Sequence, residues 1–378
     1  MKITIIGAGI GGLTTAIALK QKGFDVELFE ASHAFKKAGS GINLAINAMQ
    51  VYKKLGLYET LLKAGSYNQT MNISDENLTP ISVIDMCGFE ETFNVKSVAI
   101  HRAVLHEILL NELSDVPIYM GKKLKTLTSA KNETSLTFED GTSHKATVLI
   151  GADGIHSVVR KALFNATQIR DAKQICWRGI TKIELPSTYQ TQLVEQWGKG
   201  KRFGFVSISE TEYYWYALAN YKTDARAEFK DLNLVDFYAD FHPIVGDLLK
   251  STPKKDRLTH TMMDLKPLTT WHKNKVCLLG DSAHATTPNF GQGACQAIES
   301  AYALANCLAS NALPEKAFEA FQKIRIEKAT DIVNTSWRIG KLAHLENRFL
   351  IKLRNLVLRN TPSSITQKQS QRMFDVNG

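Results

Sequence analysis

Three glycines near the N-terminus have the spacing of a phosphate-binding turn. Gly7, Gly9 and Gly12 follow a β-branched run at residues 2–6 and open a helical pattern. In this spacing the first glycine permits a tight turn, the second lets a pyrophosphate approach the backbone, and the third lets the helix pack closely on the sheet. Glu30 ends the next predicted strand, where an acid accepts hydrogen bonds from ribose hydroxyls. The pattern predicts dinucleotide binding but does not separate FAD from NAD.

Two later strand ends carry an aspartate. Apolar runs at residues 148–151 and 276–279 are followed by Asp153-Gly154 and by Asp281. The carboxyl ends of strands are where open α/β sheets bind their ligands. An aspartate in this position also often caps the following helix, which is the alternative interpretation.

A glycine-containing segment follows Asp281 and opens an apolar helix. Its binding residues would be Pro288, Gly291, Gln292 and Gly293. Because the N-terminus of a helix attracts negative charge, this segment predicts a surface for a group with partial negative charge, such as the pyrimidine edge of a reduced flavin.

The whole-chain composition excludes several classes of protein. The chain has 44% hydrophobic and 22% charged residues and only 9 Pro in 378, so it is neither collagenous nor disordered. Its five cysteines are odd in number and far apart, which predicts neither a disulfide framework nor a metal or redox pair. We find no apolar run of about 18 residues and no signal peptide, so a cytoplasmic location is expected.

Taken together, these motifs resemble those of the single-component FAD-dependent aromatic hydroxylases, of the p-hydroxybenzoate hydroxylase type. The resemblance covers nearly the whole chain in the family's order: the glycine turn with its acid, Arg102 opening a mid-chain helix, Asp153-Gly154, and Gly280-Asp281 with PxxGQG. The stretch GDSAHATTPNFGQGACQAIES is most similar to the branch of FAD-dependent urate hydroxylase and zeaxanthin epoxidase.

The resemblance implies a role for each motif residue. Gly7, Gly9 and Gly12 would hold the FAD pyrophosphate and Glu30 the adenosine ribose. Arg102 would bind the phosphate and ribityl region, with a solvated surface charge as its alternative. Asp281 would bind the ribityl chain, and Asp153 would serve FAD indirectly. Residues 288–293 would line the isoalloxazine ring.

The predicted fold class is α/β, α+β overall. It consists of a Rossmann-like FAD-binding domain, an inserted β-sheet substrate domain and C-terminal helices. The FAD-binding domain is expected to be discontinuous, at residues 1–70, 100–172 and 272–330. The substrate domain would take residues 71–99 and the strand-rich stretch 173–271, and residues 331–378 would form a helical C-terminal segment.

The resemblance also implies the chemistry. NADH or NADPH would reduce FAD, O2 would add to the flavin as a C4a-hydroperoxide, and a small electron-rich substrate, aromatic or heterocyclic, would be hydroxylated or epoxidised. The chain has only one GxGxxG motif, so the nicotinamide would bind transiently without a domain of its own. A reductase of the geranylgeranyl-reductase type, with the same FAD frame but no oxygen transfer, is the alternative.

Two residues of the strand-rich stretch are candidate substrate contacts. Arg202 ends the predicted hairpin turn Gly198–Arg202 and begins a strand, and Tyr214 lies on the next strand. In the urate hydroxylase branch an arginine and a tyrosine at similar places contact the substrate. An arginine would neutralise an anionic oxygen and a tyrosine would orient the ring. The alternatives are a solvated turn charge and a core aromatic residue.

Residues 201–208 (KRFGFVSI) imitate an RNA-binding signature. Arg202 stands where that signature has glycine and Ile208 where it has its last aromatic residue, so no nucleic-acid partner is expected. No Cys/His cluster has zinc-ligand spacing, so no metal is expected either.

The basic balance of the chain is concentrated in its tail. Of the net charge of +9, residues 315–378 supply 12 Lys+Arg against 6 Asp+Glu. A single helix from Trp337 to Arg359 is predicted, with an apolar stripe and a basic face. The stripe is Leu342, Leu345, Phe349, Leu353 and Leu356, and the basic residues are Arg338, Lys341, Lys352 and Arg359. The stripe is expected to pack on the FAD-binding domain, with peripheral membrane contact as the alternative. A monomer or a homodimer is expected.

Overall fold

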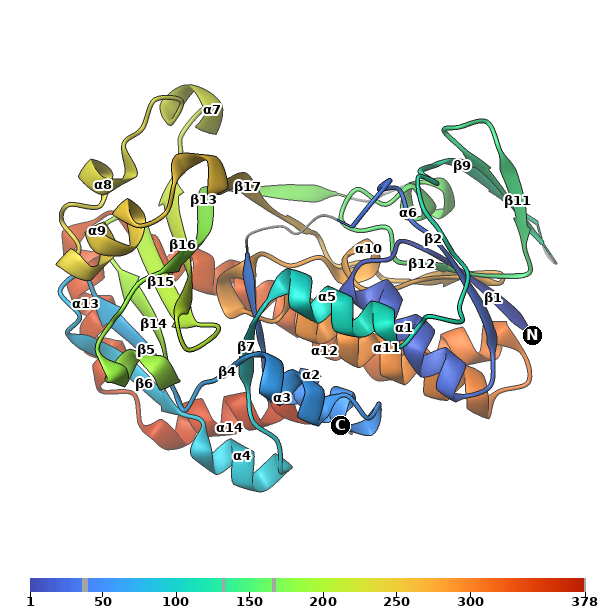
Figure 1. Cartoon of the computed structure of the whole chain (residues 1–378), viewed down its shortest axis with the longest axis horizontal. Helices are drawn as coiled ribbons and strands as arrows, with labels where there is room; N and C mark the ends of the chain where they lie inside the picture. The colour runs from blue at the N-terminus through green and yellow to red at the C-terminus, as the bar shows by residue number, and fades with distance from the viewer. Residues whose placement is uncertain (36–39, 131–132, 165–167, 377–378) are drawn as a thin grey trace.

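A computed structural model describes residues 1–35, 40–130, 133–164 and 168–376. Two large sheets dominate it, one at each end of the long axis, and long helices run between them (Figure 1). The mixed α/β class predicted from the sequence is confirmed.

The first large sheet contains the predicted N-terminal βαβ unit. Its six strands have the order β18-β19-β12-β1-β2-β8, with every neighbouring pair parallel except β18 and β19. Their bounds are β1 (Lys2–Ile6), β2 (Asp25–Phe29), β8 (Ile118–Tyr119), β12 (Val148–Gly151), β18 (His272–Lys273) and β19 (Val276–Leu278). The central strands are short apolar runs because a parallel sheet is covered on both faces. Their carboxyl ends, at Ile6, Gly151 and Leu278, lie side by side.

Helices cover this sheet and join it to the rest of the molecule. They are α1 (Ile10–Gln21), α2 (Ile46–Lys54), α3 (Tyr58–Ala64), α4 (Cys87–Phe93), α5 (Arg102–Asn111), α6 (Val158–Leu163), α10 (Asp281–His284), α11 (Gly293–Ser310) and α12 (Pro314–Ala343). A Cβ on Gly11 would lie 3.2 Å from the Cβ of Ala297, so α1 and α11 pack closely at their N-terminal ends.

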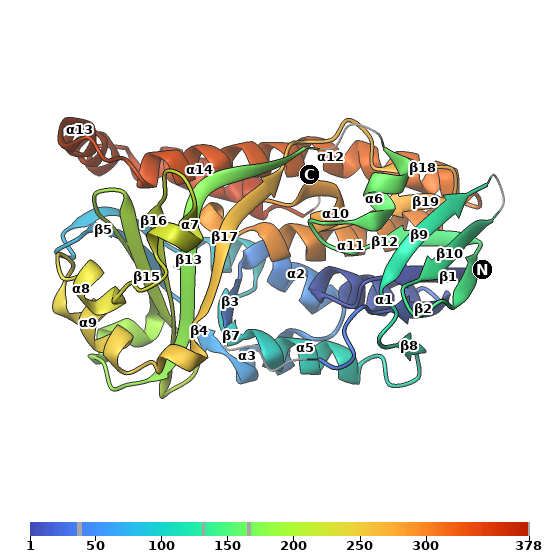
Figure 2. The same ribbon diagram turned by 90° about the horizontal axis from the view of Figure 1, so that it is seen from above.

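The second large sheet has seven strands in the order β17-β13-β16-β15-β14-β5-β6. Their bounds are β5 (Thr70–Asp75), β6 (Pro80–Asp85), β13 (Ile169–Lys182), β14 (Gln192–Trp197), β15 (Lys201–Ser207), β16 (Glu212–Asn220) and β17 (Leu258–Leu265). One face buries Phe203, Phe205 and Trp215 in an aromatic core. That core is completed by α7 (Ala225–Glu228), α8 (Leu234–Phe237) and α9 (Pro243–Lys250). The other face turns toward the first sheet and its helices (Figure 2).

Two three-stranded sheets and three short 3-10 helices complete the core of the fold. One small sheet consists of β3 (Gly41–Leu44), β7 (Val98–His101) and β4 (Ser66–Tyr67), and the other of β9 (Leu124–Ser129), β10 (Thr134–Phe138) and β11 (Ser143–Ala146). The 3-10 helices are η1 (Ser187–Thr191), η2 (Lys254–Asp256) and η3 (Pro288–Phe290). The first small sheet meets the large one, because Tyr214 of β16 packs directly on the backbone of Gly41.

The tail differs from the single helix predicted over Trp337–Arg359. Helix α12 ends at Ala343, and α13 (Arg348–Arg359) and α14 (Ser363–Phe374) follow it. The backbone is diverted at residues 344–346 because these residues bond to the turn between β14 and β15 and to the end of β16. Gly200 N donates to Leu345 O over 2.9 Å, and Asn220 Nδ2 donates to His344 O over 3.0 Å. Within the described ranges, no helix is both long and apolar enough to cross a bilayer.

Candidate active site

The glycine turn between β1 and α1 has the geometry that only glycines allow. Gly7 has a φ of +102°, and a Cβ there would lie 2.3 Å from Ala152 O. A Cβ on Gly12 would lie 1.9 Å from Gly7 O. A Cβ on Gly9, by contrast, would meet no protein atom within 4 Å. Gly7 and Gly12 therefore serve the fold of the turn, and Gly9 leaves open space at the N-terminus of α1.

Two helix N-termini at this place have no side-chain cap. Neither Gly9 before α1 nor Gln292 before α11 offers its first turn a side-chain acceptor. The first N–H groups of a helix need partners and carry partial positive charge. Both ends are therefore suited to the anionic or electron-rich parts of a cofactor, as the sequence predicted.

Glu30 is held at the end of β2 by two backbone donors. Its Oε2 accepts from Ala8 N and its Oε1 from Ser32 N, each over 2.8 Å. These bonds fix the carboxylate beside the glycine turn, and its remaining lone pairs are available to ribose hydroxyls. His106 of α5 also holds this turn, with its Nε2 2.8 Å from Ala8 O.

Asp153 caps the following helix, as its alternative interpretation proposed. Ser157 Oγ donates to one carboxylate oxygen over 2.5 Å, and the backbone N–H groups of Val158 and Val159 donate to the other over 2.7 and 3.1 Å. Its backbone also touches the glycine turn, since the Cβ position of Gly7 is 3.2 Å from Asp153 Cα. These contacts agree with an indirect role toward a cofactor.

Asp281 lies at the end of β19, where its side chain is exposed. Desolvation nevertheless raises the pKa of Asp281, while the charges of Arg102 and Arg160 oppose that rise. A carboxylate that solvent reaches but that protein atoms surround lies in a concave part of the surface, which we call the recess. Arg160 is fully buried and donates to Ser282 O over 2.9 Å, which ties α6 to the turn carrying Asp281.

Arg102 projects into the same recess from the start of α5. Its side chain is exposed, yet desolvation lowers the pKa of Arg102 and the charge of Arg178 lowers it further, with Asp281 and Tyr214 acting in the opposite direction. The recess therefore brings Arg102 and Asp281, two of the predicted cofactor residues, within electrostatic range of the second sheet.

The predicted isoalloxazine segment divides into outward and inward residues. Pro288 and Gly291 are exposed, and Gly291 is left-handed with a φ of +65°. Gln292 is buried, and its Oε1 accepts from Asn47 Nδ2 over 3.1 Å and from Gln296 Nε2 over 3.2 Å. Gln292 would therefore serve a cofactor through its backbone, together with Gly293 at the first position of α11.

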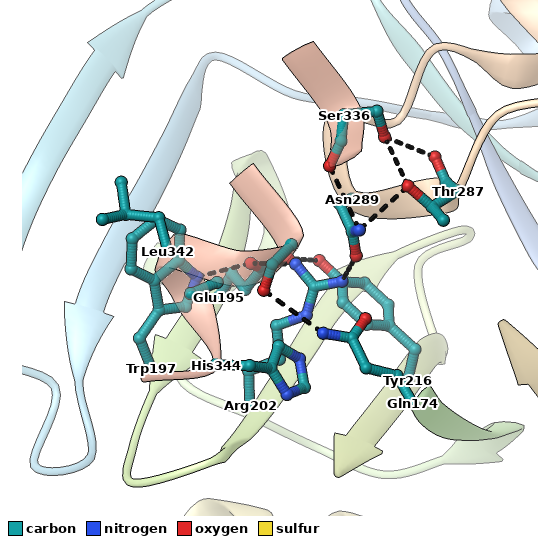
Figure 3. A network of polar contacts seen from close by, with 12 residues as sticks. Gln174, Glu195, Trp197, Arg202, Tyr216, Thr287, Asn289, Ser336, Leu342 and His344 are labelled. Atoms are coloured by element: carbon teal, nitrogen blue, oxygen red, sulfur yellow. Dashed lines mark hydrogen bonds and ion pairs between the residues drawn. The ribbon is translucent and has the colours of Figure 1, made fainter. Parts of the chain in front are cut away.

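Arg202 is fully buried in a polar network rather than free to meet a ligand (Figure 3). Its Nη1 donates to Glu195 Oε1 over 3.2 Å, and its Nη2 donates to Asn289 Oδ1. Glu195 also accepts from Trp197 Nε1 and Tyr216 Oη, each over 2.5 Å. The network connects β15 to the segment at η3, and the prediction that Arg202 contacts substrate stays a prediction.

Asn289 anchors the other end of this network. Its Nδ2 donates to Thr287 Oγ1 over 2.9 Å and to Ser336 O over 3.2 Å. Ser336 belongs to α12, so one side chain joins the second sheet, the predicted isoalloxazine segment and the longest helix (Figure 3).

Arg178 is the arginine that the sequence reasoning did not select. It lies on β13 opposite Tyr216, and Tyr214 lies one residue pair further along the same face. Arg178 is half-buried and forms no salt bridge with a described carboxylate. Its positive charge acts to lower the pKa values of Arg102, Tyr214 and His260. Strand periodicity could have put Arg178 on one face, but only the packing shows which face borders the recess.

Tyr214 and His260, two neighbours of Arg178, are uncharged at neutral pH. Desolvation raises the pKa of Tyr214 to about 12, against the opposing charges of Arg178 and Arg102. Desolvation, assisted by Arg178, lowers the pKa of His260 to about 4. Tyr214 is therefore a hydrogen-bond donor rather than a base, and Arg178 carries the local positive charge.

The described residues fit FAD. The open space at Gly9 and the uncapped helix ends suit a pyrophosphate and a flavin ring, and the fixed Glu30 suits a ribose. In the recess, Arg102 supplies a cation and Asp281 a hydrogen-bond acceptor for the part of FAD between the pyrophosphate and the flavin ring. Three supporting residues, His106, Arg160 and Arg178, were missed because none stands in a motif.

Comparisons with known proteins identify the family of the chain. The FAD binding domain family matches residues 1–336. Aurachin C monooxygenase/isomerase of Stigmatella aurantiaca is 31% identical over 98% of this chain and 97% of its own length. The 2-heptyl-3-hydroxy-4(1H)-quinolone synthase of Pseudomonas aeruginosa is 31% identical over 99% and 98%.

A solved structure shows the same fold. HpxO of Klebsiella pneumoniae, complexed with FAD and uric acid, superposes with a TM-score of 0.90 at 24% identity and covers 99% of this chain and 96% of that one. The chain therefore belongs to the FAD binding domain family and is a FAD-dependent monooxygenase.

Proposed function

We propose that this monooxygenase takes its electrons from NADH or NADPH and hydroxylates an aromatic nitrogen heterocycle of the 2-alkyl-4(1H)-quinolone class. Support comes first from the relatives that match nearly end to end, one of which is a 2-heptyl-3-hydroxy-4(1H)-quinolone synthase. It comes next from the chemistry of the sheet face that borders the recess.

That face combines apolar surface with one unbalanced cation, and this observation carries the proposal. Val206, Leu218 and Met262 are apolar and buried on it, and Arg178 is the charged group beside them. A bicyclic ring with an alkyl chain and one polar edge suits such a surface, because its polar oxygen would pair with the guanidinium.

Arg178 would also activate the substrate. A cation close to an acidic N–H or O–H group lowers its pKa and favours the anion. The anion of an electron-rich ring is the better nucleophile toward an electrophilic oxygen. Tyr214 would donate a hydrogen bond to the bound ring and, by packing on Gly41, would keep water out at that edge.

The cofactor would be held by the chain's own residues. Gly9 and the start of α1 would bind the pyrophosphate, and Glu30 would bind the ribose. Arg102 and Asp281 would bind the ribityl chain of the cofactor. Bound FAD would supply the redox chemistry that activates O2. Residues 288–293 would orient the ring toward Arg178.

The test is a substrate screen with the purified holoenzyme. We expect 2-heptyl-4(1H)-quinolone to accelerate NAD(P)H oxidation and to gain one oxygen atom by mass spectrometry. Oxygenation of uric acid in place of the quinolone would refute the substrate class. NAD(P)H oxidation with substrate reduced and no O2 consumed would favour a reductase of the geranylgeranyl-reductase type.

A further inference from the structure

Helix α13 is a regular and independently capped helix near the C-terminus. It has 12 residues, and Asn347 caps it by accepting from Phe349 N over 2.9 Å and from Leu350 N over 3.2 Å. Leucine and arginine, which favour helices, make up much of its sequence. The cap and these propensities favour the helix locally, whatever its outer side contacts.

The side of α13 that faces the protein contains the half-buried Ile351 and Leu358, but its one buried residue is an arginine. The side facing the protein carries Arg354, which is buried and donates to Leu342 O over 3.1 Å and to Ala343 O over 3.2 Å. The Arg354 guanidinium also lies 5.0 Å from the ring centroid of Trp197. The protein side of this helix is thus held by a charged residue.

The outer side of α13 is apolar. Its exposed fractions are 72% at Phe349, 60% at Leu356, 56% at Val357, 47% at Leu353 and 44% at Leu350. At 100° per residue these five side chains form one continuous face. The expectation that this stripe packs on the FAD-binding domain is therefore wrong for Phe349, Leu353 and Leu356, and Leu342 of α12 is exposed as well.

A row of basic residues borders this apolar face. Arg348, Lys352 and Arg359 follow one edge of the helix, and α13 contains no acidic residue. Arg359 donates to Pro80 O over 3.0 Å and lies 3.3 Å from Asp75, so Arg348 and Lys352 are the cations left to an outside partner. Figure 2 shows α13 at the outer corner of the molecule, beside the seven-stranded sheet.

We propose that the apolar face of α13 lies in the interface of an anionic membrane, with Arg348 and Lys352 at the lipid phosphates. An apolar face with a basic edge matches an anionic bilayer in both polarity and charge. A second copy of this chain fits less well, because a two-fold interface would bring the same basic edges together. The proposal rests on α13 alone and does not depend on which substrate the enzyme takes.

The test is cosedimentation of the FAD-loaded protein with vesicles. One set contains phosphatidylcholine alone and the other includes about a third phosphatidylglycerol, at low and at physiological salt. We expect sedimentation with the anionic vesicles, weakened by salt. Phe349→Gln, Leu353→Gln and Leu356→Gln together should lower the partition coefficient by about tenfold or more. Arg348→Gln with Lys352→Gln should lower it roughly 10- to 30-fold.

Matched variants separate this face from a general effect of exposed residues. Leu313→Gln with Ile324→Gln changes two apolar side chains that are 60% and 49% exposed on other elements. Lys254→Gln with Lys255→Gln removes two exposed cations from η2. Both pairs should sediment like the parent protein, and flavin content should report that each variant is folded.

Three outcomes would overturn the proposal. The parent protein could stay in the supernatant with anionic vesicles, or the triple variant could sediment as well as the parent. The third is a dimer by light scattering that the triple variant dissociates, which would assign the face to contact between copies.

Discussion

Arg178 and Arg202 share one sheet face but have opposite electrostatic surroundings. Arg202 is balanced by Glu195 and bonded to Asn289, so its charge is used within the protein. Arg178 has no described carboxylate partner and faces the recess beside Tyr214. The sequence favours Arg202 because its position resembles that of a substrate-binding arginine in the urate hydroxylase branch. The hydrogen-bond partners of its guanidinium, at positions 195 and 289, are apparent only in the three-dimensional structure.

Replacing these two arginines should therefore have different effects. Arg178→Met should raise the KM for substrate roughly 10- to 100-fold through the lost charge-assisted bond, with stability nearly unchanged. Arg202→Met leaves Glu195 buried without its cation and should cost roughly 3–5 kcal/mol in the free energy of unfolding. Steady-state kinetics and urea denaturation measure the two effects. Equal destabilisation by both variants would contradict the assignment of Arg178 to substrate.

A glycine variant tests the cofactor site separately from the fold. Gly9→Ala places a methyl group where the protein leaves open space but the pyrophosphate would lie. We expect normal unfolding of the apoprotein and a Kd for FAD that is roughly tenfold higher or more. Gly88→Ala, whose Cβ also meets no atom within 4 Å, is the control and should bind FAD normally.

Asp281→Ala tests the carboxylate in the recess. Loss of a hydrogen bond to a charged group should weaken FAD retention by roughly 10- to 100-fold. The exposed Asp247 of α9 provides the control substitution, Asp247→Ala. Flavin released on dilution, followed by fluorescence, gives the measurement, and unchanged retention would remove Asp281 from the cofactor site.

Elements with strong local patterns were predictable, and pairings between distant segments were not. The strand expected before Glu30 corresponds to β2, and Arg202 and Tyr214 lie on the successive strands β15 and β16. Strand β13 begins at Ile169, four residues before the strand-rich stretch expected from residue 173, because residues 169–171 pair with β17 across an irregularity. The parallel pairing of β14 with β5 joins segments over a hundred residues apart and leaves no local signal.

The hydrogen bond from Arg202 to Asn289, which joins β15 to η3, can be tested by a single substitution. Asn289→Ala disconnects Arg202 from the segment that would orient the flavin. We expect FAD to be retained. The yield of hydrogen peroxide per NAD(P)H oxidised should rise by about a factor of two or more, because the flavin ring would be less firmly positioned. Asn311→Ala, which removes a bond to Cys307 O at the end of α11, should leave the peroxide yield unchanged.

The whole molecule should lose stability in mild acid because two desolvated histidines, the buried His284 and the half-buried His260, are neutral. Desolvation lowers the pKa of His284 to about 3 and that of His260 to about 4, below the unfolded value near 6.5. The unfolded chain therefore binds more protons between pH 6.5 and pH 4. Full stability is present above pH 6.5, and each histidine removes about 1.4 kcal/mol per pH unit below it.

Urea denaturation between pH 7.5 and pH 5 measures this loss. His284→Asn should flatten the pH dependence by the share of one histidine, even if it lowers stability overall. His156→Asn, at an exposed histidine, should leave the slope unchanged. An identical slope for all three proteins would show that other groups govern the acid response.

The strand order of the first sheet has a consequence for synthesis on the ribosome. The neighbour of β1 on one side is β12, and β19 completes that edge only with residues 276–278. At translation rates of about 5–20 residues per second, the stretch from the end of β12 at Gly151 to the end of β19 at Leu278 takes roughly 6–25 s to synthesise. During that time the apolar edge of β12 has no partner strand. Residues 169–265, which form most of the second sheet, are therefore synthesised while this edge of the first sheet is still open.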